Sequence, residues 1–210
     1  MRSISDIVAQ AVERYPNIAL VSDSTIASTI TDIEYELYQF MGKLTSQDKT
    51  VTVNNAAVDM GAYFRSDNLV RVVFFNQVGT PGGSLDPNVE YQTIEDIESL
   101  KIEDFPQYLK LPLNDANYNV ATVFYRAIPT AISSDANDWD STYPVIDDEY
   151  IQVIVYKLIK QLSIFGDAPD IAISNNYERE ALQKIAKAKT DFYARKRRNK
   201  KDRIDYRDYQ

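Results

Sequence analysis

The sequence contains neither cysteine nor histidine in its 210 residues. Without cysteine the chain has no disulfide bonds and no thiolate ligands for a metal ion. Without histidine it lacks the commonest general base and the commonest zinc ligand. Most hydrolase and metalloenzyme designs are thereby excluded, and the remaining carboxylate, lysine, tyrosine and serine residues show no recognisable catalytic spacing. We therefore expect no catalytic residues, no cofactor and no metal site.

Long apolar runs and glycine are also scarce. No stretch reaches the roughly 18 apolar residues of a membrane span, and the first predicted helix is too polar for a signal peptide. We expect a soluble, unprocessed protein that makes no membrane contact. Among only six glycines, the sequence GTPGG marks a loop at 77–87. No Gly-Lys-Ser/Thr follows it, so a protruding loop is a better interpretation than a phosphate-binding turn.

The longest apolar periodic run, at 147–166, predicts a buried helix. Acidic residues open it, and Gly166 can adopt the left-handed conformation that ends helices. A helix that is apolar over so much of its circumference must be surrounded by other elements, so the rest of the chain should cover it. Its apolar positions lie three or four residues apart: Ile151, Ile154, Val155, Leu158, Ile159, Leu162 and Phe165.

Three further amphipathic helices are predicted. One lies at 3–14 with Ser3 as its N-cap, one lies at 25–44, and the last is capped by Asn175 or Asn176. The last helix should pair with helix 147–165 as a hairpin through Leu182, Ile185, Ala188 and Phe192. The helix at 25–44 should expose a solvated face of Asp32, Glu34, Glu36 and Gln39.

Clear strands are predicted near 68–76 and 120–128 from their Val, Leu and Phe content. A weak strand or loop is predicted at 51–59. A short helix is predicted at 93–101 with Thr93 as its N-cap.

These elements predict a fold that is mainly α with a small β element, in the α+β class. Its centre is a helical bundle around the buried helix 147–165, within one domain at 1–193. Residues 194–210 form a basic and aromatic C-terminal extension, which should be extended or disordered in isolation because it has no sustained apolar face.

The net charge of −8 is unevenly distributed. Residues 177–210 contain 12 Lys and Arg against 6 Asp and Glu, a net +6, whereas residues 1–176 contain 11 against 25, a net −14. A basic end on an acidic chain suggests a partner whose surface is acidic, or nucleic acid. The candidate contact residues are Arg195, Lys196, Arg197, Arg198, Lys200, Lys201, Arg203, Tyr206, Arg207 and Tyr209.

The extension supports two interpretations. Its basic side chains could neutralise phosphates, as in sequence-independent nucleic-acid binding. Its last residues instead alternate Tyr206 and Tyr209 with Asp and Arg, and tyrosine between mixed charges suits a protein groove better than a polyanion. We favour a protein partner, and a nucleic-acid-binding regulatory protein is the alternative.

A long polar loop is predicted at 130–144, and such loops are often functional. Asp138, Trp139 and Asp140 are candidates for contact between subunits, which the 15 tyrosines also suggest. The spacing of the loop carboxylates partly fits a calcium loop, but Tyr143 stands where the sharp turn requires glycine. An enzyme that uses these carboxylates is a third alternative.

The order of the elements resembles the adaptor proteins of tailed bacteriophages, the head-to-tail connector rings beneath the portal. The resemblance covers most of 1–193. It rests on two N-terminal helices, the strand LVRVVFF, the Gly/Pro loop, the helix TIEDIESLK, an aromatic Pro-rich strip, the strand VATVFYRAIP, and the helix pair DDEYIQVIVYKLIKQL and NYEREALQKIAKAKTDFY. Its most characteristic piece is the aromatic strand with Tyr125, Arg126 and Pro129, followed by an acidic loop and by Tyr150 at a helix start.

This resemblance implies a structural virion protein at the head–tail junction, assembled in the host cytoplasm, and not an enzyme. It implies a cyclic ring of twelve copies that contacts the portal protein and a downstream tail or second ring protein. DNA would pass through the lumen without sequence-specific binding. The tail at 195–210 would dock on the portal. The Gly-rich loop would contact another ring through Gly79, Thr80, Pro81, Gly82 and Gly83.

Overall fold

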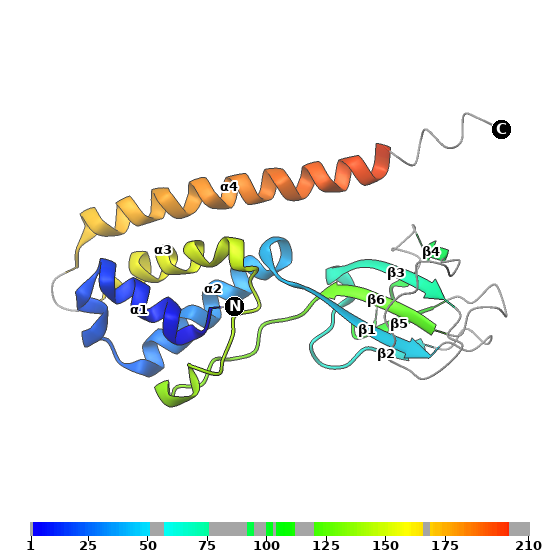
Figure 1. Ribbon diagram of the computed structural model, residues 1–210, viewed down its shortest axis with the longest axis horizontal. Coiled ribbons are helices and arrows are strands. Elements are labelled where there is room, and N and C mark those ends of the chain that lie inside the picture. The colour runs from blue at the N-terminus through cyan, green and yellow to red at the C-terminus, as the bar shows by residue number, and fades with distance from the viewer. Residues whose placement is uncertain are drawn as a thin grey trace. The chain divides into compact units, whose positions relative to one another are not determined.

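The computed structural model describes residues 2–50, 57–75, 92–94, 100–102, 104–111, 120–165 and 169–201 (Figure 1). These residues form four α-helices and two antiparallel sheets, so the predicted α+β class is confirmed. The chain divides into a helical unit, Met1–Gly42 with Pro129–Gln210, and a β unit, Lys43–Ile128. This division is finer than the single domain predicted at 1–193.

The helical unit begins with α1 (Ile4–Arg14), whose start is fixed by Ser3. The Ser3 hydroxyl accepts a hydrogen bond from the Asp6 amide at 3.2 Å, and the Asp6 carboxylate accepts one from the Ser3 amide at 3.0 Å. This capping box satisfies two amides that would otherwise lack a partner. The predicted helix and its N-cap are confirmed, and a 3-10 turn at Pro16–Leu20 follows.

The next helix, α2 (Asp23–Met41), corresponds to the one predicted at 25–44. Its predicted end is wrong, because Leu44 already belongs to a strand. The chain leaves the helix at Gly42, where a Cβ would lie only 2.4 Å from the carbonyl oxygen of Tyr38. Glycine is required by this close approach of the two backbone segments.

The predicted buried helix corresponds to α3 (Ile151–Leu162), preceded by a 3-10 turn at Asp148–Tyr150. The helices α1, α2 and α4 all contact it. Phe165 lies beyond the helix end and is 58% exposed, so its predicted place on the buried face is wrong. Gly166 lies outside the described residues. The seven buried residues of α3 are Ile151, Val153, Ile154, Val155, Leu158, Ile159 and Leu162.

The last helix, α4 (Ile171–Lys201), begins earlier than predicted. Asp170 caps it, because its Oδ1 accepts a hydrogen bond from the Ile173 amide at 3.0 Å. The N-cap predicted at Asn175 or Asn176 is therefore wrong.

The helices α3 and α4 pack side by side as the predicted hairpin, but small side chains make much of the contact (Figure 1). Ser174, Ala181 and Ala188 recur every seven residues and are buried. Of the predicted stripe, Ile185 is buried and Leu182 is 57% exposed. Ala188 of the predicted stripe is also confirmed, but the prediction missed Ser174 and Ala181, whose small side chains allow the two helices to approach closely.

The β unit contains a four-stranded antiparallel sheet of order β1-β6-β3-β4 and a separate two-stranded sheet of β2 and β5. The strands predicted near 68–76 and 120–128 are the two central neighbours, β3 and β6, with Val72 opposite Val123. The bounds are β1 Leu44–Thr50, β2 Ala57–Asp59, β3 Leu69–Phe75, β4 Gln92–Ile94, β5 Tyr108–Lys110 and β6 Val120–Arg126; a 3-10 turn lies at Ser66–Asn68.

Both outer strands of the larger sheet were missed from the sequence. The strand β1, LTSQDKT, is polar after Leu44, and its residues alternate between exposed and half-buried. Thr93 lies in β4 opposite Val73, so the helix predicted at 93–101 is wrong at its first residue. Pairing with β3 prevails there over the local helix pattern. Of the weak segment at 51–59, only β2 lies within the described residues.

The core of the β unit is centred on two aromatic rings. Phe64 packs edge-to-face on Tyr125, with ring centroids 5.0 Å apart. Burial raises the pKa of the Tyr125 hydroxyl above its usual 10.0. The buried residues around them are Met60, Leu69, Val72, Leu100, Leu109, Leu111, Ala121 and Val123.

Candidate functional site

The predicted partner-contact residues lie at and beyond the end of α4. Residues 194–201, expected to be extended or disordered, are helical, so that expectation is wrong for them. Arg, Lys and Ala favour helix, and basic residues stabilise the C-terminal end of a helix dipole. The backbone of Arg195, Lys196, Arg197, Arg198, Lys200 and Lys201 therefore belongs to α4, whereas Arg203, Tyr206, Arg207 and Tyr209 lie outside the described residues.

The helical form concentrates charge. The eight residues 194–201 include six basic and no acidic residues, and at 1.5 Å per residue they occupy about 12 Å of helix. Within the helical unit, the C-terminal part of α4 extends well beyond the first turn of α3 (Figure 1). The last eight residues of α4 thus carry six basic residues.

The loop at 130–144 contains the predicted subunit-contact residues. Trp139 is buried within the single chain, and its indole N–H donates to the Ser133 carbonyl at 2.8 Å. Asp138 and Asp140 lie close by and are exposed, with Asp138 accepting a hydrogen bond from the Ser133 hydroxyl at 2.7 Å. A contact through this loop would use the carboxylates and not the indole.

Two side chains of α2 hold this loop. The Glu34 carboxylate, 2% exposed, accepts a hydrogen bond from the Val145 amide at 2.7 Å. The Thr31 hydroxyl accepts one from the Ile132 amide at 3.1 Å. The prediction that Glu34 lies on a solvated face is wrong. Its position four residues after the buried Ile30 is the pattern that indicates the inner side of α2.

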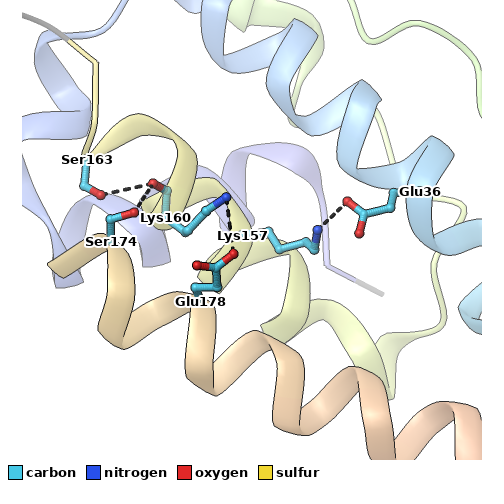
Figure 2. Close-up of polar contacts among 6 residues, drawn as sticks. All are labelled: Glu36, Lys157, Lys160, Ser163, Ser174 and Glu178. Carbon is cyan, nitrogen blue, oxygen red and sulfur yellow. Dashed lines mark hydrogen bonds and ion pairs between the residues drawn. The ribbon is translucent and has the colours of Figure 1, made fainter. Parts of the chain in front are cut away.

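Ion pairs connect three helices of the helical unit (Figure 2). Lys157 of α3 pairs with Glu36 of α2, and Lys160 of α3 pairs with Glu178 of α4 at 3.5 Å. Both carboxylates are about half exposed, so each pair contributes roughly 0–1 kcal/mol. The first pair joins α3 to α2 and the second joins α3 to α4, and neither adds much stability.

The turn between α3 and α4 is closed by hydrogen bonds to backbone atoms. The hydroxyls of Ser163 and Ser174 both donate to the Lys160 carbonyl, at 3.1 and 3.2 Å (Figure 2). The Asp170 amide donates to the Ser163 carbonyl at 2.8 Å. These bonds satisfy carbonyls near the end of α3 and fix the start of α4 against it.

An aromatic hollow on the β unit was not predicted. Phe105, 58% exposed, packs edge-to-face on Tyr108 with ring centroids 6.1 Å apart. The lining residues are Ala57, Ile102, Phe105, Gln107 and Tyr108, so the hollow has no charged side chain. Its composition suits a protein contact better than chemistry.

The candidate Gly-rich loop, Gly79 to Gly83, lies outside the described residues. Within the residues that are described, no group of three acidic side chains is arranged to hold a metal ion. None of the described helices has the length and apolar character needed to cross a bilayer.

A comparison with protein families gives one match: the model of the SU10 adaptor protein family aligns with residues 2–203. No curated protein matches the sequence. The family match spans both units and all four α-helices, including the elements on which the phage-adaptor resemblance rests. The chain therefore belongs to the SU10 adaptor protein family, a family of phage head-to-tail adaptors.

Proposed function

We propose that this protein is a subunit of a connector ring that joins the portal vertex of a phage head to the tail and lets DNA pass. Membership of the family carries this proposal, because it makes the protein a structural adaptor of the virion, at the head–tail junction. Scaffolding and docking, without catalysis, are the proposed activities.

The basic end of α4 docks on the portal protein in this proposal. Six positive charges within 194–201 would be attracted to an acidic surface, and such complementarity speeds association and orients the partners. The tyrosines of 202–210, which follow directly in the sequence, would add buried area to the contact.

Neighbouring copies form a ring, which we propose to contain twelve subunits as in the resembling adaptors. A ring brings two different faces of each subunit together. Asp138 and Asp140 are proposed contacts between subunits, and the loop at 79–83 is a proposed contact with a downstream tail or second ring protein. The acidic part of the chain, 1–176, would repel DNA in the lumen and let it slide.

A binding assay with purified portal protein tests the docking role. One variant ends after Lys201, which removes 202–210 and leaves α4 intact; a second, Arg197→Glu/Arg198→Glu, reverses charge at constant length. We expect each to weaken portal binding by about tenfold or more, since a truncated charge contact costs about 2–5 kcal/mol when buried.

The matched control is Lys184→Glu/Lys187→Glu, which makes the same charge change at two exposed positions earlier on α4. It should leave portal binding within a fewfold of the unchanged protein. An equal loss of portal binding in Arg197→Glu/Arg198→Glu and in the control would contradict docking by the C-terminal end of α4.

The alternative is a nucleic-acid-binding regulator, which the six basic residues of 194–201 favour. It predicts DNA affinity that falls steeply with salt and that is lost in Arg197→Glu/Arg198→Glu. The same variant therefore serves both hypotheses, with portal protein and DNA as the two ligands.

A further inference from the structure

Two basic side chains of the helical unit converge on one tyrosine ring. The Arg14 guanidinium of α1 lies 5.1 Å from the centroid of the Tyr156 ring on α3, and the Lys184 ammonium of α4 lies 5.7 Å from the same centroid. Tyr177 of α4 packs against Tyr156, with ring centroids 5.6 Å apart. Three helices thus bring two cations and two aromatic rings together. We call this group the Arg14 cluster; it comprises Arg14, Tyr156, Tyr177 and Lys184.

The contacts within the Arg14 cluster orient its cations without neutralising them. The side chain of Gln152, one turn before Tyr156, accepts a hydrogen bond from Arg14 at 3.0 Å and donates one to Gln10 at 2.8 Å. The two tyrosines are half-buried, whereas Arg14 and Lys184 are exposed. An aromatic face and an amide oxygen attract a cation but carry no net charge. Both positive charges therefore remain available to a ligand.

Neither cation of the Arg14 cluster has a carboxylate partner among the described residues. Glu180, one turn before Lys184 on α4, makes no ion pair with it. Lys157 and Lys160 of α3, in contrast, each pair with a carboxylate of a neighbouring helix. The sequence has 31 acidic and 23 basic residues, so carboxylates are not in short supply. Two oriented cations without a partner indicate a site for an anionic group of another molecule.

An acidic counterpart lies elsewhere on the same unit, in the loop at 130–144. The loop contains three exposed aspartates and no Lys or Arg. Hydrogen bonds from the amides of Ile132 and Val145 to side chains of α2 hold it near both ends. Because the loop and the cluster are both held in place before they meet, little conformational freedom would be lost on binding. The three carboxylates belong to Asp135, Asp138 and Asp140.

The loop and the Arg14 cluster lie at opposite ends of α1. At the start of the helix, the Ile4 amide donates to the Thr142 carbonyl of the loop at 2.9 Å. Arg14 is the last residue of the helix. Ten residues separate Ile4 from Arg14, which is about 15 Å along the helix axis. The loop of one chain is therefore held away from the cluster of the same chain, and the two surfaces are available to different neighbours.

We propose that the Arg14 cluster of one copy binds the acidic loop of a second copy. Asp138 and Asp140 are the carboxylates that meet the cations of the cluster. Because the two surfaces are different and lie apart on one unit, each subunit can contact one neighbour through the cluster and another through the loop, as a closed ring requires. This contact rests on the proposed ring for its biological role, and it supplies the basic surface for the loop contact proposed there.

Charge reversal on each surface tests the contact in the full chain. Arg14→Glu/Lys184→Glu makes the cluster acidic, and Asp138→Lys/Asp140→Lys makes the loop basic; all four positions are exposed. In sedimentation at low salt, each variant alone should self-associate about tenfold more weakly than the unchanged protein, because like charges then face each other. An equal mixture of the two should associate again, since each surface then meets the opposite charge.

Three controls accompany these variants. Arg65→Glu/Lys110→Glu reverses two exposed charges of the β unit and should leave self-association within a fewfold. Asp140→Lys alone changes a carboxylate that accepts no hydrogen bond from the described residues, so it keeps the test available if the double loop variant does not fold. Portal binding of the Lys184 variants is measured below the concentration of self-association, so that it reports the portal contact alone. Circular dichroism confirms that each variant folds.

Several results would overturn the contact. A mixture that associates no better than either variant alone, a cluster variant that self-associates like the unchanged protein, or an unchanged protein that stays monomeric at high concentration would each do so. Loss of DNA or portal binding in Arg14→Glu/Lys184→Glu, with self-association unchanged, would assign the cluster to that ligand instead.

The ring and the contact can fail separately. Restored association in the mixture, for a protein that is absent from phage particles, would overturn the ring and leave the contact in place. A ring found in particles, without restored association in the mixture, would overturn this contact alone.

Discussion

The neighbouring helices α3 and α4 form one hairpin, yet the protein buries them very differently. Seven of the twelve residues of α3 are buried. In α4, among the side chains described, only Ser174, Ala181, Ile185 and Ala188 are buried. Apolar residues around α3 require cover on several sides, whereas α4 is held on one side. The same hairpin thus combines a scaffold helix with a helix whose remaining surface is available to partners.

The largest effect on stability should come from removing a buried side chain of α3. Ile154→Ala removes a fully buried side chain from α3 and should cost about 2–5 kcal/mol of unfolding free energy. Urea unfolding measures the loss. Leu182→Ala on α4 is the matched control and should stay within about 0.5 kcal/mol. Similar losses of unfolding free energy in the two variants would contradict the difference in burial between α3 and α4.

A larger side chain at the contact between α3 and α4 tests the close approach of the two helices. Ala181→Leu places a large side chain in the small-residue contact and should destabilise by about 1–3 kcal/mol. Ala186→Leu adds the same atoms at an exposed position of the same helix and should be nearly neutral. Melting temperatures of the two variants give the comparison. Equal melting temperatures for the two variants would contradict packing of the Ala181 side of α4 on α3.

The start of α4 gives a smaller effect. Asp170→Ala removes the carboxylate that caps the Ile173 amide and should cost about 1 kcal/mol. Asn175→Ala tests the cap expected from the sequence and should cost less than about 0.5 kcal/mol. Urea unfolding of both variants decides which residue begins the helix, and the reverse order would restore the sequence-based assignment.

The smallest effect should come from the ion pair across the hairpin. Glu178→Gln breaks the pair with Lys160 at partly exposed positions and should cost about 0–1 kcal/mol. The difference from the unchanged protein should shrink further in high salt, because salt screens exposed charges. A loss above about 2 kcal/mol would mean that charge, and not the small-residue contact, holds α4.

Helices were predicted correctly from the sequence where short-range patterns determine them. The Ser3 cap of α1 and the apolar spacing of α3 are local patterns, and both predictions are confirmed. The start of α4 is also local, because Asp170 caps an amide three residues further on, and the prediction missed it. The strand β1 and the pairing of Thr93 depend instead on contacts between distant segments. No local pattern contains that information, so the predictions there were wrong or missing.

The conformation of the candidate contact residues was not predicted correctly. The basic residues of 194–201 were identified by composition, but their helical conformation was not, because a charged run without an apolar face gives no packing pattern. Glu34 was misplaced because a carboxylate is rarely buried without a partner, and its partner Val145 lies 111 residues away.

The most direct test of the connector role is the copy number of this protein relative to the portal subunit in purified phage particles, measured by quantitative mass spectrometry. A connector ring matched to the portal predicts near-equal numbers of the two proteins. Absence of the protein from the particles would contradict the connector role and would favour the nucleic-acid-binding alternative.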